Sequence, residues 1–276
     1  MSNLASSEAN LGSATRESGP RSVAIFAARA AFLLVFLTVW EGAVAAGIAD
    51  PAFVSTPTSV VRSLWLLFRD GEVISDLGTT LLEIMIAFLL SVVFGIASAV
   101  VLDRNDWLTR VVSPFLTAFN SMPRIALGPL FVLWFGIGIA SKVVLAFSLG
   151  YFIMLLSTLG GLKNVDRDLL LMSRLFGASE LRLFRHVRLP WALPGIFAGL
   201  KLTLIYCSAG AVIGEMIAAK SGLGLLVQTF SGRFDVAGVM AVILVVAFVV
   251  MALTSLMELS ERRLLAWSKG STDVPG

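Results

Sequence analysis

Apolar runs long enough to cross a lipid bilayer are the feature that most limits how this chain can fold. Residues 236–257 contain no charged side chain, and residues 139–162 contain only Lys142. A helix needs about 20 mostly apolar residues to cross the hydrocarbon core of a membrane. Only 14% of the whole chain is charged and 57% is hydrophobic, whereas soluble proteins carry about 25% charged residues and 45–50% apolar residues. We therefore expect an all-α membrane protein embedded in the lipid bilayer.

Six apolar segments in all are candidates for membrane-spanning helices. The third of them contains Pro123, Arg124 and Pro129. Because proline removes a backbone donor and clashes with the preceding turn, we expect this span to be a broken helix. The six expected spans are residues 30–47, 79–102, 111–135, 139–162, 194–218 and 236–257.

The positions of the basic residues predict how these spans are oriented. Most of the 21 Lys and Arg residues lie in the two tails and in the loops that follow the second and fourth spans. Positively charged loops remain in the cytoplasm, so both termini are expected inside. The sequence thus predicts a disordered cytoplasmic tail at 1–22, a transmembrane permease domain at 23–265 and a cytoplasmic tail at 266–276.

Several classes of function are excluded by composition. A net charge of +3 is too small for nucleic-acid binding. The single cysteine, Cys207, excludes an intrachain disulfide, and the single histidine, His186, leaves no histidine-based metal site. The chain also lacks the Gly-x4-Gly-Lys-Ser/Thr phosphate loop, so we expect it to hydrolyse no ATP. No catalytic residue, metal or cofactor is predicted.

The loop at residues 163–193 is the longest polar segment between two spans. Its pattern predicts two short helices around a break, the first capped by Asn164 and ended by Gly177. The second is capped by Ser179 and stopped by Pro190. An apolar ridge on this second helix would either dock into a cytosolic partner or rest on anionic lipid, and the residues alone do not choose between them. The ridge consists of Leu181, Phe184 and Val187.

This loop resembles the EAA loop of ABC-importer permeases, whose pattern is E-A-A-x3-G-x9-I-x-L-P. Gly177, its spacing to Val187 and the following Leu-Pro pair match, whereas Leu171, Met172 and Ser173 occupy the E-A-A positions. The resemblance implies that this coupling loop, between the fourth and fifth spans, contacts a cytosolic ATPase. The residues it assigns to that contact are Leu171, Met172, Ser173, Gly177, Ala178, Ser179, Leu181, Phe184, Val187, Leu189 and Pro190.

Two further segments strengthen the resemblance, which covers residues 56–256 in family order. Residues 123–138 are similar to the third span of permeases for nitrate, sulfonate, taurine and thiamine-precursor uptake. Residues 214–216 and 221–224, Gly-Glu-Met and Ser-Gly-Leu-Gly, are similar to the segments around the end of the fifth span. A member of this family is expected in the bacterial inner membrane as a multi-pass protein.

The resemblance also implies which proteins would assemble with this chain. A second copy of the permease would form a homodimer with the transport pathway at its interface. Two cytosolic ABC ATPase subunits and an extracytoplasmic substrate-binding protein would complete the importer, which carries a small polar organic solute or an oxyanion. The tentative pathway residues are Pro123, Arg124, Pro129 and Glu215.

Alternatives remain for the charged residues within the spans. Arg124 either faces the pathway, pairs with the carboxylate of Glu83 or Glu215, or extends to the membrane interface. Glu83 and Glu215 themselves lie near span ends, where interfacial carboxylates are common. The alternatives for the whole protein are a secondary transporter, which would need midplane coupling carboxylates and an inverted repeat, and a membrane receptor or scaffold that does not transport.

Overall fold

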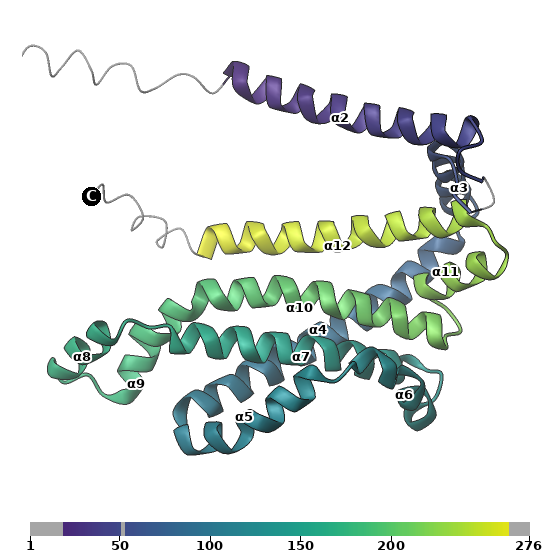
Figure 1. Cartoon of the computed structure of the whole chain (residues 1–276). Coiled ribbons are helices and arrows are strands. Elements are labelled where there is room, and N and C mark those ends of the chain that lie inside the picture. Colours follow the sequence, from purple (N-terminus) through teal and green to yellow (C-terminus); the bar gives the residue numbers. More distant parts are fainter. Residues whose placement is uncertain (1–18, 51–52, 265–276) are drawn as a thin grey trace, which may run out of the picture. The chain divides into compact units, whose positions relative to one another are not determined.

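The computed structural model describes residues 19–50 and 53–264, and every regular element in this part of the chain is a helix (Figure 1). The chain divides into two units, residues 1–62 and 63–276. The expected N-terminal tail lies outside the described residues up to residue 18. The chain is helical from Gly19 to Ala45, so residues 19–22 of the expected tail belong to a helix. The C-terminal tail expected at 266–276 lies outside the described residues.

The first unit is built around one long apolar helix. Helix α2 (Gly19–Ala45) covers most of the first expected span and begins earlier, because residues 23–31 are rich in alanine and contain no glycine or proline. Its Glu41 accepts hydrogen bonds from the Thr58 hydroxyl at 2.7 Å and the Thr58 amide at 3.2 Å. These bonds cap the first turn of helix α3 (Pro57–Arg69), which starts in this unit.

The second unit has a core of three helices, α4 (Glu72–Arg104), α7 (Ile139–Lys163) and α10 (Leu189–Ile217). Helix α7 lies between the other two and packs along both (Figure 1). The contact between α7 and α10 is close: a Cβ atom at Gly199 would lie 2.6 Å from the Ser157 Cβ. The residues that fill the first part of this core are Ile84, Ala87, Val143, Ala146, Leu204, Cys207 and Ala211.

A bent helix pair occupies the third expected span. Helix α5 (Asp106–Ser121) is followed by a short 3-10 turn, η1 (Arg124–Leu127), and by α6 (Gly128–Phe135), and the two parts are bent by 79°. The expected break is therefore confirmed. Pro123 lies at the non-helical junction, and Pro129 lies in the first turn of α6, where a missing amide donor costs nothing.

The described residues include five helices long and apolar enough to cross a membrane, or six if the bent pair counts as one span. Besides those already named, α12 (Val236–Leu264) is one of the five, and the shorter α11 (Leu223–Gly232) precedes it. Arg104, Lys163 and Arg188 lie together at one end of the three-helix core, which we call the basic end. Helix α11 packs against α4 and α10 at the opposite end (Figure 1).

The loop at the basic end contains α8 (Arg167–Leu175), α9 (Glu180–Leu183) and a π-helical turn, η2 (Phe184–Arg188). Pro190 does not end the second helix as expected, because η2 leads directly into α10. In the wider π turn the Leu189 amide bonds to the Phe184 carbonyl, five residues back. Pro190 then falls in the first turn of α10, where it is tolerated, and one helical segment runs from Glu180 to Ile217.

Candidate functional site

The turn between α8 and α9 is set by Gly177. Its φ angle is +77°, a left-handed conformation that favours glycine. The Ala178 amide donates to the Ser173 carbonyl at 3.1 Å, and the Gly177 amide donates to the Arg174 carbonyl at 2.9 Å. These two bonds form a Schellman motif, which ends α8 at the position the sequence predicts.

The start of α8 differs from the expectation. Asp166 is its cap, since the carboxylate accepts a hydrogen bond from the Asp168 amide at 2.9 Å. Asn164 instead ends α7, and its carbonyl accepts a hydrogen bond from the Trp191 indole at 3.1 Å. Both residues are good caps, so the sequence alone could not choose between them. The choice follows from α7, which continues to Lys163 and leaves room for a cap only further along.

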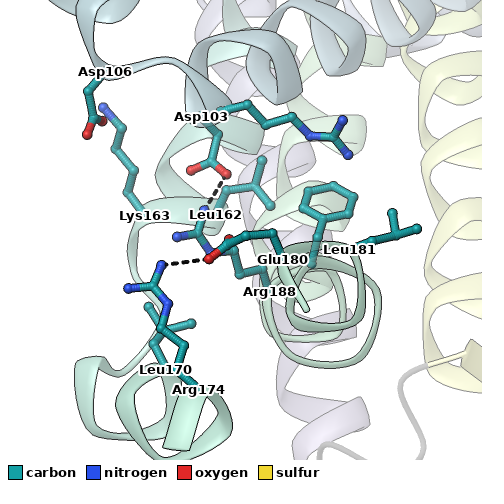
Figure 2. Close-up of a pocket in the computed structure, with 11 residues that line it drawn as sticks. Asp103, Asp106, Leu162, Lys163, Leu170, Arg174, Glu180, Leu181 and Arg188 are labelled. Carbon is teal, nitrogen blue, oxygen red and sulfur yellow. Dashed lines mark hydrogen bonds and ion pairs between the residues drawn. The ribbon is translucent and has the colours of Figure 1, made fainter. Parts of the chain in front are cut away.

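Ionic contacts join the loop to the three-helix core. The Arg188 guanidinium donates to the Asp103 carboxylate at 2.9 Å, so the start of α10 is tied to the end of α4. The Arg104 guanidinium lies 5.0 Å from the centre of the Phe184 ring. Within the loop, Arg174 and Glu180 pair at 3.1 Å across the Gly177 turn. Figure 2 shows both ion pairs pointing into one pocket of about 860 Å³ between α8, α9 and the ends of α4 and α7.

Breaking the contact between Asp103 and Arg188 is expected to release the start of α10. In Asp103→Ala the Arg188 side chain, only 22% exposed, would lose its counter-ion at a cost on the order of 3 kcal/mol. Hydrogen exchange of the amides at 180–188 in lipid nanodiscs should accelerate. Glu180→Ala is the matched control, because the pair it removes is exposed and contributes at most about 1 kcal/mol. Equal acceleration in both variants would contradict the anchoring role of Asp103.

The loop also presents large apolar side chains to solvent. Leu175 and Phe176 are 87% and 86% exposed, more than the other large apolar side chains of α8 and α9. Apolar side chains this exposed at a helix end indicate a contact surface. The resemblance did not assign these two residues, although their position directly before the Gly177 turn, at the tip of the loop, could have identified them. We call the exposed apolar set Leu171, Met172, Leu175, Phe176 and Leu181 the loop tip.

The other residues assigned to ATPase contact fall into two groups. Phe184 and Leu189 are partly buried and pack against the core cluster that contains Met154 and Leu162. Val187 and Pro190 are also partly buried. These four residues thus face largely inward, and the expected ridge of Leu181, Phe184 and Val187 is not one exposed face. Ser173, Gly177, Ala178 and Ser179 form the turn itself, and the hydroxyl of Ser173 bonds to the Leu169 carbonyl at 2.8 Å.

The second candidate site is the break between α5 and α6. Arg124 begins η1, and its guanidinium donates to the Ser148 carbonyl of α7 and, at 2.8 Å, to the Asn120 side chain. The guanidinium also lies 4.5 Å from the centre of the Phe152 ring. Ser121, Met122, Pro123, Ile125 and Ala126 are exposed in the single chain, Arg124 is partly buried, and α5 has no buried residue. In a bilayer, irregular backbone must be covered by protein or line an aqueous cavity.

Neither expected carboxylate pairs with Arg124. In the described part of the chain its hydrogen bonds go to a backbone carbonyl and an amide side chain, and its guanidinium also lies against an aromatic face. Glu83 and Glu215 are 1% and 0% exposed, so neither is an interfacial carboxylate. They lie instead at the opposite end of the core, where Glu215 bonds to Thr80 and Gly224. The pathway assignment of Glu215 stays a prediction.

A helical membrane protein with a broken span and a helical loop at one end of its core has the organisation of a transport permease. Residues 91–266 match the family described as "Binding-protein-dependent transport system inner membrane component". The match covers more than half of the chain, which belongs to this family of ABC transporter permeases. It is therefore a multi-pass protein of the inner membrane.

Several similar proteins are named for the solutes that they transport. The chain is 32% identical to the formylaminopyrimidine transport permease protein ThiX of Halalkalibacterium halodurans, over 86% of this chain and 94% of that protein. It is 31% identical to the taurine transport system permease protein TauC of Escherichia coli (85% and 87%). It is 30% identical to the riboflavin transport system permease protein RibX of Chloroflexus aurantiacus (85% and 88%). The expected subgroup is confirmed.

Solved structures confirm the fold. An inward-facing structure of the MetNI methionine ABC transporter matches with a TM-score of 0.59 at 24% identity, over 73% of this chain and 95% of that chain. A crystal structure of an amino acid ABC transporter with histidines matches with a TM-score of 0.60 at 18% identity, over 72% and 97%. At these identities the likeness concerns the arrangement of helices alone.

Proposed function

We propose that this chain is the permease subunit of an ATP-driven importer for a small solute that carries an anionic group. The observation that supports this most directly is the loop tip, a set of exposed apolar side chains on a loop anchored to the core through Arg188 and Asp103. An apolar tip on a rigid helical base suits insertion into a groove on a cytosolic ATPase subunit. ATP hydrolysis belongs to that subunit in this proposal.

The orientation follows from charge. The basic end carries Arg104, Lys163 and Arg188, and the loop between them adds further arginines. Basic loops remain in the cytoplasm, so the basic end and both termini are assigned to the inside. The opposite end, with α11 and Glu215, then faces the substrate-binding protein outside.

Coupling would proceed along α9 and α10. Since η2 joins them without a break, a displacement of α9 by the ATPase is transmitted to α10. The pair formed by Asp103 and Arg188 links the same displacement to α4. ATP binding and hydrolysis would thereby switch access to the pathway between the two sides of the membrane.

A second copy of the chain would cover the break at Pro123. Helix α5 has no buried residue and Met122 and Pro123 after it are exposed in the single chain, and lipid cannot satisfy an open backbone. A homodimer that buries this region would enclose a pathway next to Arg124. The Arg124 charge is held by neutral groups, which leaves it available for an anion. Sulfonates such as taurine, which the similar protein TauC transports by name, fit this chemistry.

Reconstituted transport tests the proposal. The chain is co-purified with the ATPase and binding protein of its importer and placed in proteoliposomes, with radiolabelled taurine, ethanesulfonate or nitrate outside. We expect ATP-dependent accumulation of at least one of these solutes. The double variant Leu175→Glu/Phe176→Glu should lose the ATPase and lower uptake by about tenfold or more, since it places charge on an apolar contact.

His186→Ala provides the matched control, because His186 is exposed on the same loop but lies outside the loop tip. It should retain both the ATPase and uptake. Accumulation that needs a proton or sodium gradient and no ATP would instead indicate a secondary transporter. Normal ATPase binding by the double variant would refute the loop tip as the contact.

A further inference from the structure

A buried polar cluster joins α4, α7, α10 and α11 at the end of the core opposite the loop. Its carboxyl groups are those of Glu83 on α4 and Glu215 on α10, which are within hydrogen-bonding range of each other. Both side chains are almost fully enclosed, at 1% and 0% exposure. Two carboxylates in contact repel each other unless a proton lies between them. The neighbouring donors and acceptors show which of the two carries it.

Both oxygens of Glu215 accept hydrogen bonds. The Gly224 amide donates to Oε2 at 2.6 Å, and a backbone amide can only donate. The Thr80 hydroxyl lies 2.7 Å from Oε1. Because Thr80 itself accepts from the Leu223 amide at 2.9 Å, its own hydrogen is free to point toward Glu215, the nearer of its two acceptors. Glu215 is therefore bonded as a carboxylate.

Glu83 is bonded in the opposite way. Its Oε2 atom is buried and receives a hydrogen bond from no donor in the described part of the chain. An ionised oxygen in that position would be costly, whereas a protonated Glu83 carboxyl group can supply the hydrogen for the contact with Glu215. The two sets of contacts assign the shared proton to the Glu83 side.

The charges around the pair agree with this assignment. Glu215 lies at the start of α11, where the helix dipole favours a negative charge. Lys142 is 3% exposed, lies within electrostatic range of both carboxyl groups, and bonds to the carbonyls of Ile137 and Gly138 at 2.5 and 3.0 Å. A neutral Glu83 leaves one buried cation opposite one buried anion, which is far less costly than an excess charge.

The pair also determines the position of the chain after α10. The turn at Gly222 wraps around the Glu215 side chain, with a φ angle of +122° and no room for a Cβ atom, which would collide with the carboxylate. The Gly222 amide bonds to Asp76 of α4 at 2.7 Å, next to the bonds of Leu223 and Gly224. The three backbone amides at the start of α11 thus all donate to side chains: Gly222 to Asp76 at the edge of the cluster, and Leu223 and Gly224 to Thr80 and Glu215 within it.

We propose that Glu83, in its protonated form, and Glu215, as a carboxylate, are a positioning pair that fixes residues 221–224 and the start of α11 to the three-helix core. Neither residue needs to touch the solute. The inference stands apart from the proposed function, since it concerns which carboxyl group holds the proton and which segment it positions.

Infrared spectroscopy of the purified permease in nanodiscs at neutral pH tests whether Glu83 carries the proton. We expect a C=O stretching band of a protonated, solvent-shielded carboxyl group in the natural protein and its loss in Glu83→Gln. If the natural protein lacks this band, or if the band persists in Glu83→Gln, the assignment is overturned. This measurement does not depend on transport or on the ATPase.

Hydrogen exchange at residues 222–226 tests the positioning. Glu83→Gln should match the natural protein, because an amide N–H replaces the carboxyl O–H as donor to Glu215. Glu215→Gln should accelerate exchange by about tenfold or more, since its one remaining acceptor oxygen cannot serve three donors. Equal acceleration in both variants would show that Glu83 acts as a charge, and no acceleration in Glu215→Gln would show that the pair does not position the turn. Either result overturns the inference.

Discussion

Gly177→Val should lower ATP-driven uptake by about tenfold or more while the chain still inserts and folds. Gly177 has a φ angle of +77°, which costs an ordinary L-residue about 1–2 kcal/mol and a β-branched residue more. Apart from its chain neighbours, no atom of the described residues lies within 4 Å of the Cβ position, so in the free chain the cost is one of backbone conformation alone. The strain is relieved if the Schellman turn opens, and opening redirects α8 and the loop tip away from the ATPase.

The variant Gly177→Asn distinguishes the effect of backbone conformation from the effect of adding a side chain. Asparagine adopts the left-handed conformation more readily than other residues and is larger than alanine. We expect this variant to retain most of the uptake and to co-purify with the ATPase, whereas the valine variant loses both. Retention of the ATPase by Gly177→Val would count against the turn as the element that orients the loop tip.

Arg124→Ala should reduce uptake of an anionic solute by about ten- to a hundredfold, the value of a hydrogen bond to a charged group. Co-purification with the ATPase should be unchanged, because Arg124 lies in the bent helix pair, whereas the loop tip lies at the basic end of the core. Arg124→Lys keeps the charge but loses the planar fork, and we expect it to recover part of the uptake. Uptake is measured in the same proteoliposomes.

Asn120→Ala is the control for this series. It removes one contact that orients the guanidinium and leaves the charge in place, so a small loss of uptake is expected. If Arg124→Ala transports the anion as well as the natural protein, the residue serves only to tie η1 to the Ser148 carbonyl of α7. The solute would then be selected without a fixed cation at the break.

Local sequence signals predicted the features of this chain that depend on neighbouring residues. The presence of long apolar helices follows from apolar run length, the break from Pro123, and the end of α8 from Gly177. The prediction that Pro190 ends the second helix of the loop was wrong because its effect depends on the turn before it. The π turn shifts the hydrogen bonds there, so the helix continues although Pro190 has no backbone amide hydrogen.

Contacts between distant segments were beyond the sequence. Glu83 and Glu215 are 132 residues apart along the chain, and each alone is a charged residue near a span end, where interfacial carboxylates are common. Only the contact between the two residues and the bonds of Glu215 to Thr80 and Gly224 offset the cost of burying these carboxyl groups. The partner of Arg124 was missed for a similar reason, since a backbone carbonyl on α7 leaves no mark in the sequence.

The helical segment from Glu180 to Ile217 has a mechanical consequence. Its 38 residues extend over roughly 55 Å at the helical rise per residue, longer than the hydrocarbon core of a bilayer. One end lies at the loop and the other carries Glu215, so one continuous helix connects the loop mechanically to the buried cluster. A tilt imposed at the loop end also displaces the end that carries Glu215, and it moves α11 because α11 is fastened there.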